Sequence, residues 1–169
     1  MTTPPSDVVV RPALAADVDR VAPLFDAYRQ FYGAQSDFAA ARTFLADRLS
    51  RGESVVLVAC LAPSHLGVDG EVIGLAQLYP SFSSLALGPT IVLNDLFVAT
   101  EWRGRGVARR LLERVEAHAR AVGAVRIELA TQHTNHRALR LYEQRGYVRD
   151  SEFVHLSLAV PRSADAPAP

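Results

Sequence analysis

The chain has 169 residues, of which 49% are hydrophobic and 21% charged, a composition that indicates a folded globular protein and excludes a disordered one. Its 18 basic and 18 acidic residues balance, so no net charge attracts nucleic acid or a membrane surface, and neither partner is expected. We see no secretory signal and no apolar run of membrane-spanning length, and we therefore expect a cytoplasmic protein. The single cysteine, Cys60, excludes an internal disulfide and is expected to be a small buried hydrophobe.

Both ends of the chain are rich in Pro, Ala and Ser. Residues 1–6 and 161–169 are therefore expected to be flexible, and residues 7–160 to form one domain. This length is sufficient for one substantial hydrophobic core.

Hydrophobic spacing predicts two helices near the start of that domain. After a short strand at 7–12, apolar residues spaced by three and four predict a helix over 15–32. Pro23 would either kink this helix or mark a late start. Ser36 resembles the N-cap of a second helix, whose apolar stripe extends to Leu49.

The rest of the chain predicts three strands, a helix, a strand, a short helix and a closing strand. The expected strands are at 53–62, 71–80, 90–99, 124–131 and 152–160, with a turn at 63–70, and the expected helices begin near Gly106 and after Asn135. Gly146 stands where a left-handed residue commonly ends a helix. The order β-αα-βββ-α-β-α-β predicts a mixed α/β domain with a largely antiparallel sheet and one or two crossovers.

The stretch "TEWRGRGVARRLL" (100–112) places two glycines among arginines directly before a predicted helix. A helix N-terminus leaves about four amides unpaired, glycine lets the backbone approach an anion, and arginine adds charge-assisted bonds to phosphate. The stretch therefore predicts a phosphate-binding turn. A G-x-G-x-x-G motif would need glycine where Arg109 stands, and the G-K-[ST] of a P-loop is absent. An ordinary surface turn with solvated arginines is the alternative.

Two segments resemble the GNAT superfamily of N-acetyltransferases. The run R-G-R-G-V-A from Arg103 to Ala108 resembles the signature R/Q-x-x-G-x-G/A, and residues 131–147 resemble N-x-x-A-x-x-L-Y-x-x-x-G-[FY]. The order of elements over 7–160 is also similar to theirs. Within the superfamily, both segments look like the diamine or polyamine enzymes and the small yeast-type enzymes that act on polyamines, histones or D-amino acids. The resemblance implies a sheet that splays between its fourth and fifth strands, acetyl-CoA bound there, and a homodimer.

Carried over by position, the resemblance implies which residues bind acetyl-CoA. The backbone of Leu96, Phe97 and Val98 would pair with the pantetheine arm. Asn135 would contact that arm or the end of the fifth strand, and Tyr142 would face the thioester sulfur. The N–H groups of the glycine-rich turn would hold the pyrophosphate: Arg103, Gly104, Arg105, Gly106, Val107 and Ala108.

Acetyl transfer also needs a proton donor for the leaving thiolate. A thiol has a pKa of about 8.5 and tyrosine one of about 10, so Tyr142 can hold a proton at rest and return it, as a general acid does. A role as a core aromatic residue of a short helix is the alternative.

The proton acceptor is harder to assign. The position of Asn94 commonly carries glutamate in the diamine-type members, and an amide cannot take a proton at neutral pH. Asp95 is the nearest carboxylate, but strand alternation places it on the face of Leu93 and Phe97 unless a β-bulge re-aims it. Asp95 is therefore a candidate base or amine anchor. A structural role for Asp95, a relay through water and a lesser candidate, Glu128, are the alternatives.

Aromatic residues near the first two helices and the third expected strand could face the acceptor, because aromatic rings hold ammonium groups by cation–π contact. The residues expected to bind the substrate are Tyr28, Tyr32, Tyr79 and Phe82, with simple packing of the helices as the alternative. No acidic cluster suited to a polycation is visible, which weighs against polyamines. His133 and His136 have no carboxylate or thiol at ligand spacing, so no metal is expected.

These features predict an N-acetyltransferase that uses acetyl-CoA to modify the primary amine of a small molecule or amino acid. Acetylation of a protein lysine or N-terminus is one alternative. A CoA-binding or interaction protein that has lost catalysis is another, and Asn94 keeps it open.

Overall fold

The computed structural model describes residues 7–62 and 70–161. Most of the turn expected at 63–70, and nearly all of the two ends expected to be flexible, lie outside these residues. The chain divides into two compact units, residues 1–130 and 131–169.

The first unit is built on a five-stranded sheet in the order β1-β2-β3-β4-β5. Its strands are β1 (Val8–Pro12), β2 (Val55–Leu61), β3 (Val72–Ser83), β4 (Gly88–Val98) and β5 (Arg126–Leu129). All neighbours pair antiparallel except β4 and β5, which are parallel and therefore need a crossover between them. This confirms the predicted mixed, mostly antiparallel sheet.

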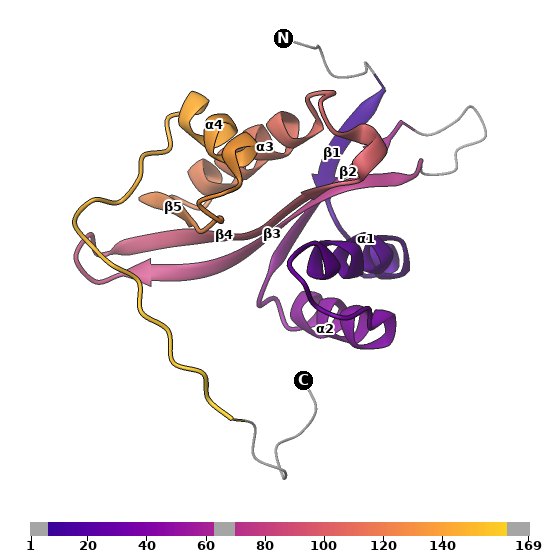
Figure 1. Cartoon of the computed structure of the whole chain (residues 1–169), viewed down its shortest axis with the longest axis horizontal. Coiled ribbons are helices and arrows are strands. Elements are labelled where there is room, and N and C mark those ends of the chain that lie inside the picture. The colour runs from indigo at the N-terminus through magenta and orange to yellow at the C-terminus, as the bar shows by residue number, and fades with distance from the viewer. Residues whose placement is uncertain (1–6, 63–69, 162–169) are drawn as a thin grey trace. The chain divides into compact units, whose positions relative to one another are not determined.

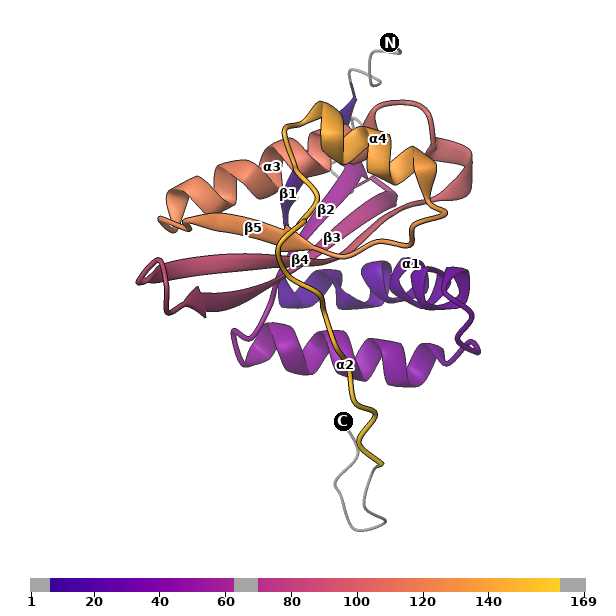
Figure 2. The ribbon, with the colours of Figure 1, turned by 60° about the vertical axis from the view of Figure 1, so that its left-hand side comes forward.

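Helices cover both faces of this sheet. One face carries α1 (Val18–Phe31), which follows a 3₁₀ turn, and α2 (Phe38–Ser50), whereas α3 (Val107–Ala121) lies on the other face (Figures 1 and 2). The apolar stripes of α1 and α2 pack on β2 and β3 through Val21, Phe25, Leu45, Val58 and Leu75. On the α3 side, a Cβ atom added at Gly74 would lie 3.1 Å from Leu111 and 3.2 Å from Val107, so the glycine allows α3 to approach β3 closely.

The start of the two paired helices differs from the prediction. Helix α1 begins at Val18 and continues through Pro23, so a late start at the proline is wrong. The N-cap of α2 is Asp37 and not Ser36, because the Asp37 carboxylate accepts a hydrogen bond of 3.0 Å from an amide of the first turn. The Ser36 hydroxyl instead donates to Asp26 of α1 at 2.6 Å, which ties the loop back to the middle of α1.

The second unit contains α4 (His136–Gln144). As predicted, Asn135 is its N-cap, accepting from the Ala138 amide at 3.2 Å, and Gly146 follows it with a φ of +88°. The strand predicted at 152–160 is wrong, since residues 153–161 form no helix or strand. A strand needs a neighbour to bond, and this segment leaves its alternating apolar side chains exposed: Val154, Leu156, Leu158 and Val160 are 85%, 93%, 87% and 80% exposed.

Two further predictions concern the chain as a whole. Cys60 lies in β2 and is buried, as expected. Among the described helices, none combines the length and the apolar composition needed to cross a bilayer.

Candidate active site

The glycine-rich turn joins β4 to α3. Gly104 and Gly106 have φ values of +82° and +79°, a left-handed conformation that other residues rarely adopt. The amide of Arg110 donates to the carbonyl of Gly106, so the amides of residues 107–109 precede the first bond of the helix. These amides and the positive end of the helix dipole fit an anionic group such as a pyrophosphate.

The Arg103 side chain contacts an aromatic surface. Its Nε atom donates to the carbonyl of Val98 at 2.9 Å. Its guanidinium lies 5.0 Å from the ring centre of Phe97 and 5.6 Å from that of Phe31. Arg103 therefore connects the turn to the end of β4 and to α1, a role that the sequence did not predict.

The neighbouring arginines are also engaged within the protein. Arg105 lies over the ring of Trp102 at 5.0 Å, and Arg109 pairs with a glutamate one turn along α3 at 3.5 Å. Arg110 donates to the backbone carbonyl of Val8, so it joins α3 to β1. The fit of the turn to an anion therefore depends mainly on its backbone amides.

A β-bulge lies in the middle of β4. Across the β3–β4 ladder, Gln77 is opposite Asp95 and Leu78 is opposite Leu93, which leaves Asn94 as an extra residue. The bulge reverses the alternation of side chains, so Asp95 shares a face with Gln77 and not with Leu93. That face is the one covered by α1 and α2, because it also carries Leu75.

The sheet opens at the same place. The β4–β5 ladder pairs Thr90–Leu93 with Arg126–Leu129 and ends one residue before the bulge. The last residues of β4 continue beyond this ladder and include Leu96, Phe97 and Val98. The predicted splay between the fourth and fifth strands corresponds here to the early end of β5 at Leu129, beyond which β4 continues to Val98. It leaves a strand edge that an extended molecule can pair with.

Asp95 is a buried carboxylate, only 3% exposed. Its Oδ1 atom accepts a hydrogen bond of 3.0 Å from the side-chain amide of Asn94. Burial raises the pKa of the Asp95 carboxyl, although hydrogen bonds from Tyr28 and Asn94 oppose this effect. A raised pKa makes Asp95 a better proton acceptor near neutral pH. Glu128, by contrast, is 47% exposed and pairs with Arg126 at 2.8 Å.

Beside Asp95, the C-terminal half of α1 and the end of β4 form an aromatic cluster, which consists of Phe25, Tyr28, Phe31, Tyr32 and Phe97. The Tyr28 ring lies 5.9 Å from Phe97 and 5.1 Å from Tyr32, both in edge-on contact. The Tyr28 hydroxyl donates to the carbonyl of Asn94 at 3.4 Å. Two predicted substrate residues, Tyr28 and Tyr32, are thus brought together next to the bulge.

The other two predicted substrate residues lie on β3. Tyr79 is two positions from Gln77 and on the same face; burial and the Asp95 charge raise the pKa of Tyr79 to about 12, while Arg48 opposes them. Phe82 stands opposite Pro89 and is 82% exposed. It does not join the aromatic cluster, because β3 runs to Ser83 and carries Phe82 to the far end of the β3–β4 hairpin.

The predicted residues of the second unit lie on or beside α4. Tyr142 is 9% exposed, and its ring lies 5.7 Å from that of Tyr147. Asn135 caps the helix, and its side-chain amide donates to Thr131 at 3.4 Å. Their roles toward acetyl-CoA stay predictions. Within residues 7–62 and 70–161, no group of three or more His, Cys, Asp or Glu side chains is arranged to hold a metal ion.

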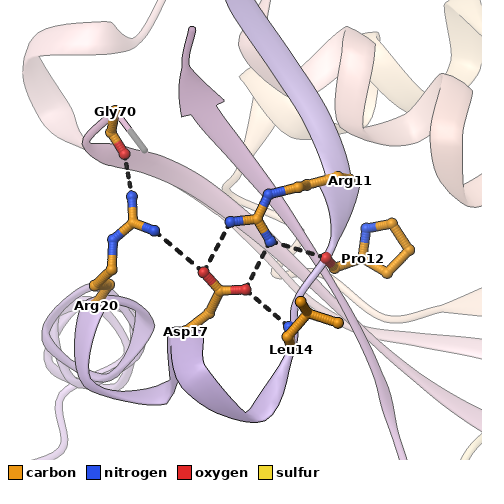
Figure 3. Close-up of polar contacts among 6 residues, drawn as sticks. All are labelled: Arg11, Pro12, Leu14, Asp17, Arg20 and Gly70. Atoms are coloured by element: carbon orange, nitrogen blue, oxygen red, sulfur yellow. Dashed lines mark hydrogen bonds and ion pairs between the residues drawn. The ribbon is translucent and has the colours of Figure 1, made fainter. Parts of the chain in front are cut away.

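An ion cluster holds the start of α1. The buried Asp17 carboxylate accepts from the Arg11 guanidinium at 2.6 and 2.8 Å, from the Leu14 amide at 2.8 Å and from Arg20 at 3.2 Å (Figure 3). Arg20 also donates to the carbonyl of Gly70, just before β3. The cluster therefore joins β1, α1 and the approach to β3, and it fixes the helix that carries Tyr28.

Two features of the first unit were not predicted from the sequence. Gln77 is fully buried opposite Asp95, and the signal was available as a lone amide in the apolar run "VIGLAQLY". A pocket of about 430 Å³ was not expected either; it is lined by Arg20, Pro23, Leu24, Ala27, Glu71, Val72, Ala99 and Glu101. None of these residues belongs to the predicted site, which is defined by the bulge, the aromatic cluster and the turn.

Comparisons with known proteins identify the family of this chain. The model of the acetyltransferase (GNAT) family matches residues 21–147. The uncharacterized N-acetyltransferase YhfO of Bacillus subtilis is 43% identical over 152 residues, covering 90% of this chain and 97% of the relative. A D-amino-acid N-acetyltransferase of Saccharomyces cerevisiae is 35% identical over 81 residues, covering 48% of this chain and 50% of the relative. A crystal structure of a probable acetyltransferase is 38% identical, with a TM-score of 0.84 over 92% of this chain and 99% of the other. The chain therefore belongs to the GNAT family of acetyltransferases.

Proposed function

We propose that the protein transfers an acetyl group from acetyl-CoA to the primary amine of a small molecule or an amino acid. One observation carries this proposal: a buried carboxylate, Asp95, stands at the bulge where β4 separates from β5, beside the aromatic cluster. A proton acceptor, a surface suited to an ammonium group and an open strand edge therefore lie in one region of the first unit.

The residues on the acetyl-CoA side fit that co-substrate. When bound, acetyl-CoA supplies the acetyl group as a thioester. The amides of residues 104–108 would hold its pyrophosphate, because two left-handed glycines and an unbonded helix start offer an anion cradle. The amide of Arg103, also predicted to do so, donates to the carbonyl of Thr100 at 3.3 Å instead. The backbone of Leu96, Phe97 and Val98 would pair with the pantetheine arm along the edge that β5 leaves open. Asn135 would contact the same arm.

The proton steps follow from the titratable groups. An alkylammonium has a pKa of about 10.4, so it must lose a proton before it attacks. Asp95 would accept this proton, and Asn94 would orient the carboxylate through the bond to Oδ1. An amide at position 94 therefore does not remove the base from the site. Tyr142 would return a proton to the departing thiolate, which its position before Gly146 in the family-like segment supports.

The acceptor would lie against the aromatic cluster, where Tyr28 and Tyr32 present ring edges and Phe97 lies under the Arg103 guanidinium. Tyr79 would line the same face of β3. A small amine or amino acid is the class that fits. The yeast relative supports this class, since its name gives D-amino acids as its substrates.

The test is the release of free thiol from acetyl-CoA by the purified protein. The panel contains small diamines, L- and D-amino acids, aminoglycosides and a lysine-containing peptide. Turnover with small amines or amino acids would support the proposal, and turnover with the peptide alone would replace it with protein acetylation. Tight binding of acetyl-CoA with no turnover on any amine would point to a CoA-binding protein without catalysis.

We also propose that the protein forms a homodimer. The segment 153–160 leaves a row of apolar side chains exposed, and Leu156 is 93% exposed. Exposed apolar rows of this kind are typical of surfaces that another chain covers. A second copy of this chain would cover the segment, in line with the family resemblance.

A further inference from the structure

Three polar atoms at the β-bulge are buried and have no hydrogen-bond partner among the residues that the structure describes. They are Oδ2 of Asp95 and both side-chain amide atoms of Gln77, Oε1 and Nε2. Gln77 is 0% exposed and Asp95 is 3% exposed, so bulk water does not reach them. Buried polar atoms in native proteins nearly always have a partner, which is often an ordered water. These three atoms therefore indicate a small buried ligand.

The three atoms belong to one location. Gln77 of β3 and Asp95 of β4 are directly opposite in the antiparallel ladder, and opposed side chains on one face have Cβ atoms about 5 Å apart. The other carboxylate oxygen, Oδ1, accepts from Asn94, whose side chain is exposed. Oδ1 thus lies toward the exposed side of the bulge. Oδ2 is the buried oxygen of the carboxylate, on the side of Gln77.

The donors and acceptors identify the ligand as water. A water molecule donates twice and accepts, so it can donate to Oδ2 and Oε1 and accept from Nε2, which gives the three bonds typical of a buried water. An ammonium group has no lone pair and would leave Nε2 unpaired. An anion would be repelled by Asp95.

We propose that Gln77 is a positioning residue for Asp95, and that the two side chains hold one ordered water behind the carboxylate. This inference rests on the proposed function, in which Asp95 accepts the proton of the amine. The water would fix the orientation of the carboxylate through Oδ2, so that Oδ1 remains available on the open side. It would also favour the charged form of Asp95 by donating a hydrogen bond to it.

The other groups that face Asp95 come from three elements. They are the Tyr28 hydroxyl from α1, the Tyr79 phenol from β3 and, beside Tyr79, the Arg48 guanidinium from α2. None of them bonds the amide of Gln77. Removal of that amide therefore breaks no direct hydrogen bond to any of these groups.

The direct test is a crystal structure of the unmodified protein at a resolution that shows ordered water. We expect a density peak within hydrogen-bond distance of Asp95 Oδ2 and of the Gln77 amide. A direct bond from Gln77 to Asp95 with no such peak would overturn the proposal. This experiment needs no variant and no substrate, so its result is independent of whether the acceptor is known.

The functional test uses Gln77→Met, which keeps the length of the side chain and removes both amide atoms. Leu75→Met is the matched control, because Leu75 lies two residues away on the same face of β3. We expect Gln77→Met to raise the pKa of Asp95, measured by carbon NMR of the carboxyl group, by about one pH unit. The acidic limb of the pH profile of kcat/KM should shift to higher pH by the same amount. At a given acidic pH, kcat/KM therefore falls up to about tenfold, with KM for acetyl-CoA unchanged.

The outcomes separate the two proposals. A carboxyl titration that is the same in Gln77→Met, Leu75→Met and the unmodified protein would reject the role of Gln77. An unmodified protein that acetylates no amine would reject the proposed function, while the crystal structure and the NMR titration would still decide whether the water is present.

Discussion

Replacing Asp17 with Asn removes a buried charge that β1 and the start of α1 share (Figure 3). Hydrogen bonds from Arg11 lower the pKa of the Asp17 carboxyl from 3.8 to about 2, although burial acts in the opposite direction. The Leu14 amide and the charge of Arg20 add to the lowering. The folded protein therefore prefers the ionised form of Asp17 more strongly than the unfolded chain does.

The lowered pKa has a calculable effect on stability. The difference between 3.8 and about 2 is worth about 2 kcal/mol, since one pKa unit corresponds to about 1.4 kcal/mol. A carboxyl whose pKa is lower in the folded state stabilises the protein above its unfolded pKa. This contribution is lost as the pH falls from about 5 to about 2.

The assay is urea unfolding of the unmodified protein and Asp17→Asn at pH 7 and near pH 3, at one protein concentration. We expect the free energy of unfolding of the variant to be about 2 kcal/mol lower than that of the unmodified protein at pH 7. This difference in free energy should shrink near pH 3. Asp19→Asn is the control, because Asp19 lies two residues away, in the first turn of α1, but is 69% exposed and pairs with Arg42. Exposed pairs contribute about 0–1 kcal/mol. An equal loss in both variants, or a loss that does not depend on pH, would refute the reasoning.

Three further predictions test the site and the assembly. Gly106→Glu should abolish acetyl-CoA binding in calorimetry, because the residue has a φ of +79° and the new carboxylate would stand in the anion cradle; unchanged affinity would remove the phosphate assignment. Tyr142→Phe should lower kcat at least tenfold with little change in acetyl-CoA affinity, and an unchanged kcat would mean that another group protonates the thiolate. Leu156→Asp should shift the protein from dimer to monomer in light scattering, whereas the neighbouring control Ser157→Asp should not; a monomeric unmodified protein would reject the dimer.

Local features of the sequence were sufficient to predict most helices. The spacing of Val18, Val21 and Phe25 specified the buried face of α1, since a helix places such residues on one side. The glycine-rich turn was also predictable. Glycine readily adopts the left-handed conformation found at Gly104 and Gly106, and the apolar stripe that follows indicates a helix. Asn135 and Gly146 marked the ends of α4 for the same local reasons.

Features that depend on distant partners were not predictable in this way. The strand predicted at 152–160 has the right alternation, but its formation depends on a neighbouring strand that the described residues do not provide. The Arg103 side chain was expected to meet phosphate, whereas its actual contacts are rings that come from α1 and β4. Gln77 gained its importance from its register with Asp95, and a register belongs to two strands at once.

The bulge at Asn94 shows why matching single positions is a poor guide to the candidate base on β4. In a regular strand, Asp95 would share a face with Leu93. One extra residue breaks this rule, so the carboxylate turns to the side covered by α1 while Leu93 keeps the side of α3. Asn94, at the position that commonly carries glutamate, donates a hydrogen bond to its neighbour's carboxylate. Under the proposed function, Asp95 would take the role of that glutamate one residue further along β4, and the bulge places its carboxylate on the side of the aromatic cluster.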